Sequence, residues 1–236
     1  MTASAFQKIN RRAIGKNIWL EHSGFGSDEL LTLSARKVEP EVFESETAVG
    51  QALFDELKAV AAAKTGDITL VLLGGRGAQA MYRLINEKAQ TDEIDDLLAR
   101  LHVFTQDALA PMRMENGLSF VRDFERLLGE NFFRKIKSFT PMRTDTDDLE
   151  SELTAYLEKL DSLGGIDIFF LGLGPEAGAA SHLCYIKPNS GATARDAAGI
   201  IPISQSILEH HINKFKVGGS EISEADETEA ATRRIF

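Results

Sequence analysis

The sequence contains very little cysteine. Cys184 is the only one among 236 residues, so no disulfide can form within the chain. A lack of disulfides is typical of proteins in reducing compartments. No apolar run approaches the roughly 20 residues that span a bilayer, and the first residues lack the apolar core of a secretory signal. We therefore expect a cytoplasmic chain without a membrane segment.

Positive charge is also scarce. The chain has 26 Lys and Arg residues against 36 Asp and Glu residues, a formal net charge of -10. Nucleic acids and anionic membranes bind positive surfaces, so neither is an expected partner. Residues 1–19 are an exception, since they contain four basic residues and no acidic one. They faintly resemble a transit peptide, but we favour a solvated, extended N-terminal arm over residues 1–25.

Repeats, low-complexity stretches and linkers rich in proline or serine are absent as well. With 43% hydrophobic residues, the chain can bury a substantial core. We therefore expect residues 1–236 to form a single α/β domain. The sequence leaves open whether the chain forms a homo-oligomer.

Helical and strand-like patterns alternate along the chain. Apolar residues at helical spacing predict helices over 47–62, from 77 onward, over 119–134, 147–163, 204–216 and 223–236. Continuous apolar runs predict strands at the start of ITLVLLGG, in LHVFTQ and in GGIDIFF. Strands of this kind are buried on both faces, which is typical of a parallel sheet. We therefore predict a Rossmann-like, three-layer fold with a mainly parallel sheet and helices on both faces.

Two of these helices have predicted N-terminal caps. Asp147 and Glu150 are positioned to cap the helix over 147–163. Ser223 is the predicted cap of the last helix, which has acidic residues in its first turn.

The first candidate site is the glycine-rich segment LLGGRGAQAMY. A strand, a glycine turn and a helix start form an anion site, because backbone N–H groups and the helix dipole point into the turn. Gly74, Gly75, Arg76 and Gly77 would bind a phosphate there, with the guanidinium as a charge-assisted donor. The alternative is an ordinary tight turn between strand and helix.

The second candidate is Asp107, which follows the second predicted strand. Parallel sheets bind ligands at the carboxyl ends of their strands, where a carboxylate can act as a general base. The alternative is a loop aspartate that bonds to its own backbone.

The third candidate is the loop LGLGPEAGAASHLCYIKPNS after the third predicted strand. It contains His182, which can transfer a proton near neutral pH; the alternative is a structural histidine. His210 and His211 are adjacent in a helix and point to different sides, so we do not interpret them as a metal pair. We expect neither a metal nor another cofactor.

Taken in order, the three sites resemble the glucosamine-6-phosphate deaminase and 6-phosphogluconolactonase superfamily. GGRGAQAMYRLI resembles its phosphate loop, HVFTQDALAP its aspartate segment, and SFVRDFERLLGENFF a helix of the deaminases. YLEKLDSLGGIDIFFLGLGP is close to a deaminase motif and favours that branch over the lactonases. The resemblance runs from about residue 48 to the end. Family members continue with further strands and helices, so it implies a sheet that is incomplete at the C-terminus.

The resemblance also assigns residues in the third loop, in either of two registers. Without a gap, Glu176 replaces the family's aspartate and no histidine aligns; Gly172 and Gly174 are the preceding turn glycines. With an insertion of about four residues, His182 matches the family's catalytic histidine and Lys187 replaces its glutamate. We prefer the second register.

In that second register, Ala180 also stands where the family has an aspartate. A lysine at 187 would lower the pKa of a nearby histidine, whereas a glutamate raises it, so ring opening by the usual route is in doubt. Lys187 would instead bind an anion or act as a base. Lys214 lies near the position of a phosphate-binding arginine in the family.

The resemblance implies a divergent deaminase or isomerase that acts on a small phosphorylated sugar. Asp107 would transfer a proton between C1 and C2, and His182 would open the sugar ring. One alternative is a sugar-phosphate-binding protein with impaired catalysis. It is motivated by Ala180, Lys187 and the missing acid after Asp107. A second alternative is a lactone hydrolase, although Gly178 stands where that branch needs its histidine.

Overall fold

The computed structural model describes residues 41–172, 198–203, 205–229 and 233–235. Its helices are α2 (Glu46–Ala63), η1 (Arg76–Ala78), α3 (Gln79–Ala89), α4 (Asp95–Leu98), α5 (Phe120–Lys135), α6 (Leu149–Ser162), α7 (Gln205–Val217) and α8 (Glu224–Thr228). Its strands are β1 (Ile68–Leu72), β2 (Leu101–Thr105), β3 (Ala108–Ala110), β4 (Ser138–Thr140), β5 (Ile168–Phe169), β6 (Ile200–Pro202) and β7 (Arg233–Ile235). None of the described helices is long and apolar enough to cross a membrane.

The main sheet contains four parallel strands in the order β4-β2-β1-β5. Strands β1 and β2 pair along their whole length, from Ile68 opposite Leu101 to Leu72 opposite Thr105. Both strands are buried at every position, as expected for strands covered on two faces. All four strands end on the same edge of the sheet, so the loops that follow β1 and β2 lie side by side.

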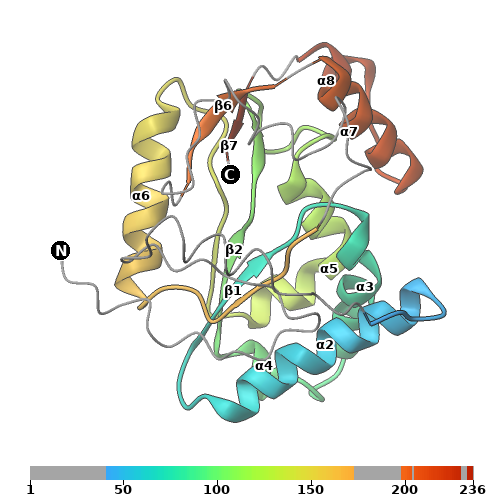
Figure 1. The fold of residues 1–236 in the computed structure, drawn as a ribbon, viewed down its shortest axis with the longest axis vertical. Helices are drawn as coiled ribbons and strands as arrows, with labels where there is room; N and C mark the ends of the chain where they lie inside the picture. Colours follow the sequence, from blue (N-terminus) through green and yellow to red (C-terminus); the bar gives the residue numbers. More distant parts are fainter. Residues whose placement is uncertain (1–40, 173–197, 204, 230–232, 236) are drawn as a thin grey trace, which may run out of the picture.

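Helices cover both faces of this sheet. In Figure 1, α6 lies against one face, while α2, α3 and α5 lie against the other. Alternate residues of β1 separate the two cores: Leu70 and Leu72 pack with Phe54 of α2 and Tyr82 of α3, whereas Val71 packs on the α6 side. The three-layer α/β fold with a parallel sheet is therefore confirmed.

Side-chain caps and one glycine define the helix boundaries. Ser45 accepts a hydrogen bond from the backbone N–H of Ala48, and Ser119 caps α5 in the same manner. The prediction that Asp147 and Glu150 cap α6 was wrong, because the N-cap is Asp148, whose side chain accepts from the backbone of Ser151. Gly129 kinks α5 with a φ of 73°.

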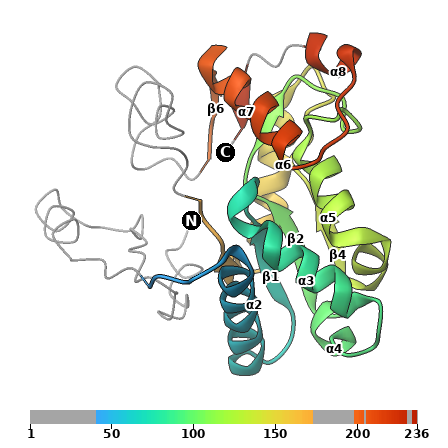
Figure 2. The same cartoon turned by 90° about the vertical axis from the view of Figure 1, so that its right-hand side faces the viewer.

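A second, antiparallel sheet has the order β3-β7-β6, and the sequence patterns did not reveal it. The predicted helix over 223–236 was also wrong. Ser223 does cap α8, in a reciprocal pair with Asp226, but α8 has no buried residue and ends at Thr228. Because α8 has no buried apolar face, no tertiary packing stabilises further turns of this helix. Residues 233–235 instead pair with β3 and β6. Figure 2 shows α7 and α8 at the opposite end of the molecule from α4.

Candidate functional site

The loop after β1 brings backbone unusually close to side chains of other elements. Gly75 adopts a φ of +116°, which residues with a side chain rarely adopt. A Cβ atom on Gly74 would lie 2.7 Å from the ring of Phe120 and 2.9 Å from Oδ1 of Asp107. Only glycine permits this approach, so the two glycines create a site where backbone, a carboxylate and an aromatic ring converge.

Asp107 contributes the carboxylate. It follows Thr105, the last residue of β2, by two positions, and it directly precedes β3. Its side chain is buried, with 3% of the residue exposed. The carboxylate therefore lies against the glycine loop at the carboxyl edge of the sheet, where open α/β sheets bind ligands.

Lys214 of α7 contributes a positive charge beside Gly75. Its Nζ lies 3.2 Å from the place that a Cβ on Gly75 would take. The ammonium lies over the rings of Phe120 and Phe215, at 4.9 Å and 5.2 Å from their centroids, which is within the range of cation–π contacts. Burial lowers the pKa of Lys214 to about 8, against a smaller upward effect from Asp123. The site therefore holds a desolvated amine beside the glycine loop.

Asp123 ties α7 to α5 beneath this site. It is buried, and its Oδ1 accepts from Arg126 at 2.6 Å and from Ser220 at 3.2 Å. Ser220 follows the end of α7, so this contact holds the C-terminal end of that helix against α5. Tyr82 supports the loop from below, because its hydroxyl donates to the carbonyl of Leu73 at 2.8 Å.

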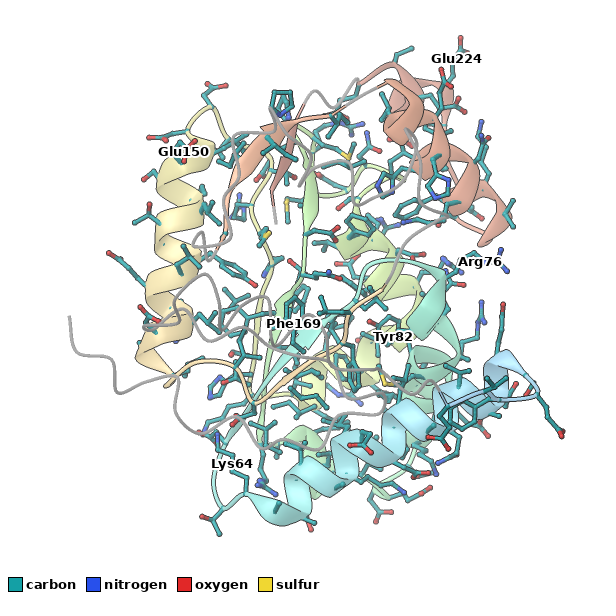
Figure 3. The ribbon with its side chains drawn as sticks, in the orientation of Figure 1. Lys64, Arg76, Tyr82, Glu150, Phe169 and Glu224 are labelled. Atoms are coloured by element: carbon teal, nitrogen blue, oxygen red, sulfur yellow. The ribbon has the colours of Figure 1, made fainter. Side chains whose placement is uncertain are left out.

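Two of the predicted phosphate ligands, Arg76 and Gly77, have surroundings that differ from those of Gly74 and Gly75. The guanidinium of Arg76 is exposed and lies 3.3 Å from Glu46 of α2, which precedes it by 30 positions. Figure 3 shows Arg76 at the outer side of the molecule, opposite Glu150 at the start of α6. Gly77 lies within η1, and a Cβ there would only touch Leu73 at 3.5 Å. The space around Gly77 would therefore accommodate a Cβ atom.

The third predicted site falls largely outside the described residues. Gly172 is the last residue described before the loop, and a Cβ on it would lie 3.0 Å from Leu73. The other predicted residues lie in the segment that is not described, namely Gly174, Glu176, Ala180, His182 and Lys187.

Sequence reasoning missed the aromatic lining of the site. The sequence predicted a helix over 119–134 without assigning Phe120 to the site, and His211 was considered only as half of a rejected metal pair. His211 is in fact fully buried, and its ring meets Phe120 edge to face at 5.6 Å. The spacing of His211, Lys214 and Phe215 at three and four residues was the available signal, since it places them on one face of α7.

A small cavity continues from Asp107 toward the start of α5. It is lined by Thr105, Asp107, Ala108, Leu109, Ser119, Phe120, Val121, Met142 and Thr144. Hydroxyl and carboxylate groups share this lining with apolar side chains, and the enclosed space is about that of one water molecule. Among the described residues, no three His, Cys, Asp or Glu side chains cluster in a way that would hold a metal.

Comparisons with known proteins agree on a single family. Residues 44–213 match the family described as glucosamine-6-phosphate isomerases/6-phosphogluconolactonase. The glucosamine-6-phosphate deaminase of Clostridium beijerinckii is 30% identical over 176 residues, which are 74% of this chain and 67% of that protein. The deaminase of Dictyostelium discoideum is 26% identical over 139 residues, 56% of this chain and 48% of that protein. The chain thus spans from about half to two thirds of these relatives' lengths.

Solved structures show the same fold at lower sequence identity. A monomeric glucosamine-6-phosphate deaminase has a TM-score of 0.56 and 17% identity, over 81% of this chain and 70% of that one. The 6-phosphogluconolactonase of Trypanosoma cruzi has a TM-score of 0.56 and 14% identity, over 83% and 72%. The family match covers well over half of the chain and includes the glycine loop, Asp107 and His211. The chain therefore belongs to the glucosamine-6-phosphate isomerase/6-phosphogluconolactonase family.

Proposed function

We propose that the chain is a divergent deaminase or isomerase of an amino-sugar phosphate, which binds the phosphate group of a hexose phosphate at the Gly74–Gly75 loop. One observation carries this proposal: the loop, the Asp107 carboxylate and the Lys214 ammonium converge at the carboxyl edge of the sheet. A phosphorylated sugar needs a cationic group near its phosphate and an acid–base group near its reacting carbons. Lys214 beside Gly75 and Asp107 beside Gly74 would provide these two groups.

The phosphate would lie beside Gly75, because backbone N–H groups and a lysine side chain there can both donate to it. Lys214 would be the main charged ligand, since its Nζ is the group near Gly75. Arg76 would add long-range attraction once it leaves Glu46, an exposed partner at 3.3 Å.

Asp107 would act as the proton-transfer base between C1 and C2 of the opened sugar. A carboxylate buried at the loop is held in place and shielded from bulk water, which favours directed proton transfer. His182 would open the ring, and Lys187 would contact an anionic part of the substrate, as expected from the sequence. The deaminase names of the curated relatives support the amino-sugar substrate.

A second candidate is a sugar-phosphate-binding protein with impaired turnover, and Ala108 favours it. The missing acid after Asp107 is replaced by this small residue, which belongs to β3 and packs in the apolar cluster with Val71 and Phe104. An acid at this position would have to be buried among apolar side chains. The site therefore has one carboxylate here instead of two.

A coupled assay for ammonia release from glucosamine 6-phosphate distinguishes the two candidates. We expect turnover by the purified chain, and a decrease in kcat of about 10²- to 10⁴-fold for Asp107→Asn, because a general base contributes that much. Unchanged binding of the substrate in this variant would assign the loss to chemistry. If the wild-type chain releases no ammonia but binds hexose phosphates in calorimetry, the binding protein is the correct interpretation.

A further inference from the structure

Lys214 differs from the other buried or half-buried lysines in its surroundings. Lys64, Lys88 and Lys135 each lie 2.5 to 2.6 Å from a carboxylate oxygen. None of the ion pairs formed between described residues includes Lys214, whose Nζ lies against two aromatic rings and the glycine loop instead. Its amine thus lies beside the glycine turn without an ion pair to a carboxylate of the described residues.

We propose that Lys214 is a site of covalent acylation by small acyl phosphates, which dock through their phosphate group at the Gly74–Gly75 loop. This inference rests on the phosphate site of the proposed function, but the reaction itself is a different activity. In it, Nζ attacks the carbonyl carbon, an amide C–N bond forms, and the C–O bond to phosphate breaks. The products are an acyl-lysine and inorganic phosphate, and the proton lost by the amine goes to the phosphate or to solvent.

The geometry selects acyl phosphates over other carbonyl compounds. In an acyl phosphate a single oxygen separates the carbonyl carbon from phosphorus, so a phosphate docked at Gly75 brings that carbon to the amine that approaches Gly75. The carbonyl of a sugar phosphate lies several bonds from its phosphorus, and the same docking places it toward Asp107. Lys214 therefore stands at the phosphate end of the site, where acyl phosphates are the reactive class.

The surroundings of Lys214 enlarge the neutral, nucleophilic fraction of its amine. Burial lowers its pKa to about 8, and Asp123 on α5 offsets part of that effect. His210 on α7 has a pKa lowered by burial and by Lys214, so it adds no strong positive charge near neutral pH. The positive charge of Arg126 is paired with Asp123. The carboxylate of Asp107 lies beside Gly74, whereas the amine of Lys214 lies beside Gly75. At pH 8 about half of such amines are neutral, against roughly 0.3% for a lysine at the ordinary pKa of 10.5.

Acylation would close the site to its own ligand. The amide has no charge, so it removes the cation that binds phosphate, and the added acyl group occupies the space beside Gly75. The modification would therefore couple the level of acyl phosphates to the occupancy of the sugar-phosphate site.

The test uses acetyl phosphate and the full-length chain at about pH 8, with the rate of acetylation at each lysine followed by mass spectrometry of proteolytic peptides. Lys216 is the internal control, because it belongs to the same helix but is exposed and pairs with Glu227 at 2.6 Å. We expect Lys214 to react at least about tenfold faster than Lys216, since burial lowers the pKa of Lys214 to about 8 and only Lys214 lies beside Gly75. Excess inorganic phosphate should slow the reaction at Lys214 and leave Lys216 unchanged.

Acetic anhydride, which has no phosphate group, shows whether docking contributes. A larger Lys214 to Lys216 ratio with acetyl phosphate than with the anhydride supports the proposal, whereas equal ratios overturn it. Equal rates at the two lysines, or no protection by phosphate, also overturn it. Calorimetry with inorganic phosphate separates the acylation of Lys214 from the proposed function. Phosphate binding without selective acylation would refute the acylation alone. Absence of phosphate binding would refute the phosphate site on which both proposals depend.

Discussion

The two ends of the parallel sheet contain similar charged residues in very different surroundings. At the amino end, Lys64 lies 2.5 Å from Asp167, and Lys137 lies 2.7 Å from Asp67. At the carboxyl end, Lys214 lies against aromatic rings and a glycine turn, and burial lowers its pKa. The lysines at the amino end are already paired with carboxylates, whereas the desolvated amine at the carboxyl end can gain a partner from an anionic ligand. We therefore propose a structural role for the amino end and ligand binding at the carboxyl end.

The largest effect should come from removing the key charge at each end. Lys214→Met should weaken hexose phosphate binding by about 10- to 100-fold, because it removes a charge-assisted hydrogen bond. Its thermal midpoint should stay the same or rise, since the variant no longer buries a charge. Asp167→Ala should leave binding unchanged but lower the free energy of unfolding by about 1–3 kcal/mol, because Lys64 and the backbone N–H of Thr69 lose their acceptor. Calorimetry and thermal unfolding measure both.

Lys216→Met is the matched control for Lys214→Met. This exposed lysine in the same helix should be replaceable with little change in either binding or stability. Equal losses of binding in the two lysine variants would mean that the general charge of α7, and not the position of Lys214, attracts the ligand.

Glycine substitutions test the difference between the two ends of the sheet by adding a methyl group at each end. Gly74→Ala should reduce hexose phosphate affinity about tenfold and lower stability by about 1–3 kcal/mol, because the added methyl overlaps Phe120 and approaches Asp107. Gly66→Ala, before the amino end of β1, has nothing within 4 Å of its new methyl but a φ of +89°. It should cost about 1 kcal/mol of stability from backbone strain and leave affinity unchanged. Normal affinity in Gly74→Ala would separate that loop from the binding site.

The pH dependence of phosphate affinity tests whether Lys214 is the main charged ligand of the phosphate. The protonated amine binds a phosphate dianion, so affinity should fall by about fivefold or more as pH rises from about 7 to about 9, through the pKa of about 8. Titration calorimetry at a series of pH values measures this. In Lys214→Met the decline over that interval should be lost, and its persistence would assign the titration to another group.

Stability should respond to pH in the opposite sense. The folded pKa of Lys214, about 8, lies below the ordinary value of 10.5, so the unfolded chain binds more protons between these two values. The free energy of unfolding of the wild type should therefore rise relative to Lys214→Met as pH increases from about 8 to about 10.5. Chemical denaturation of both proteins across this range provides the measurement.

The smallest expected effect is that of Arg76→Ala. Because Arg76 is exposed and pairs with Glu46, its loss should weaken hexose phosphate binding only about two- to threefold. Glu46→Ala should strengthen binding slightly, since it frees the guanidinium. A loss for Arg76→Ala as large as that for Lys214→Met would move the main phosphate ligand from α7 to the loop.

Much of the fold could be predicted from the sequence because long apolar patterns determine it. The runs of β1 and β2 and the stripes of α2, α5 and α6 are local signals of burial. The antiparallel sheet could not be found in this way, since β3, β6 and β7 have three residues each and depend on pairing between distant segments. The same pairing explains why residues 233–235 are not helical.

The candidate site could be predicted only in part, for a related physical reason. Asp107 and the glycines were found because strand ends and turns have local signatures. The role of Phe120, and the desolvation of Lys214 by Phe120 and Phe215, depend on packing between α5 and α7. The spacing of residues within a single segment of the sequence does not predict a contact between α5 and α7. Arg76, the obvious cation of the loop, is instead paired with Glu46.

The most direct test is a crystal structure of the chain with bound glucosamine 6-phosphate. We predict that the phosphate group lies within hydrogen-bond distance of Nζ of Lys214 and the backbone N–H of Gly75, and that C1 and C2 face the carboxylate of Asp107. A phosphate bound elsewhere, with Lys214 still packed against the aromatic rings and no ligand at Gly75, would contradict the account.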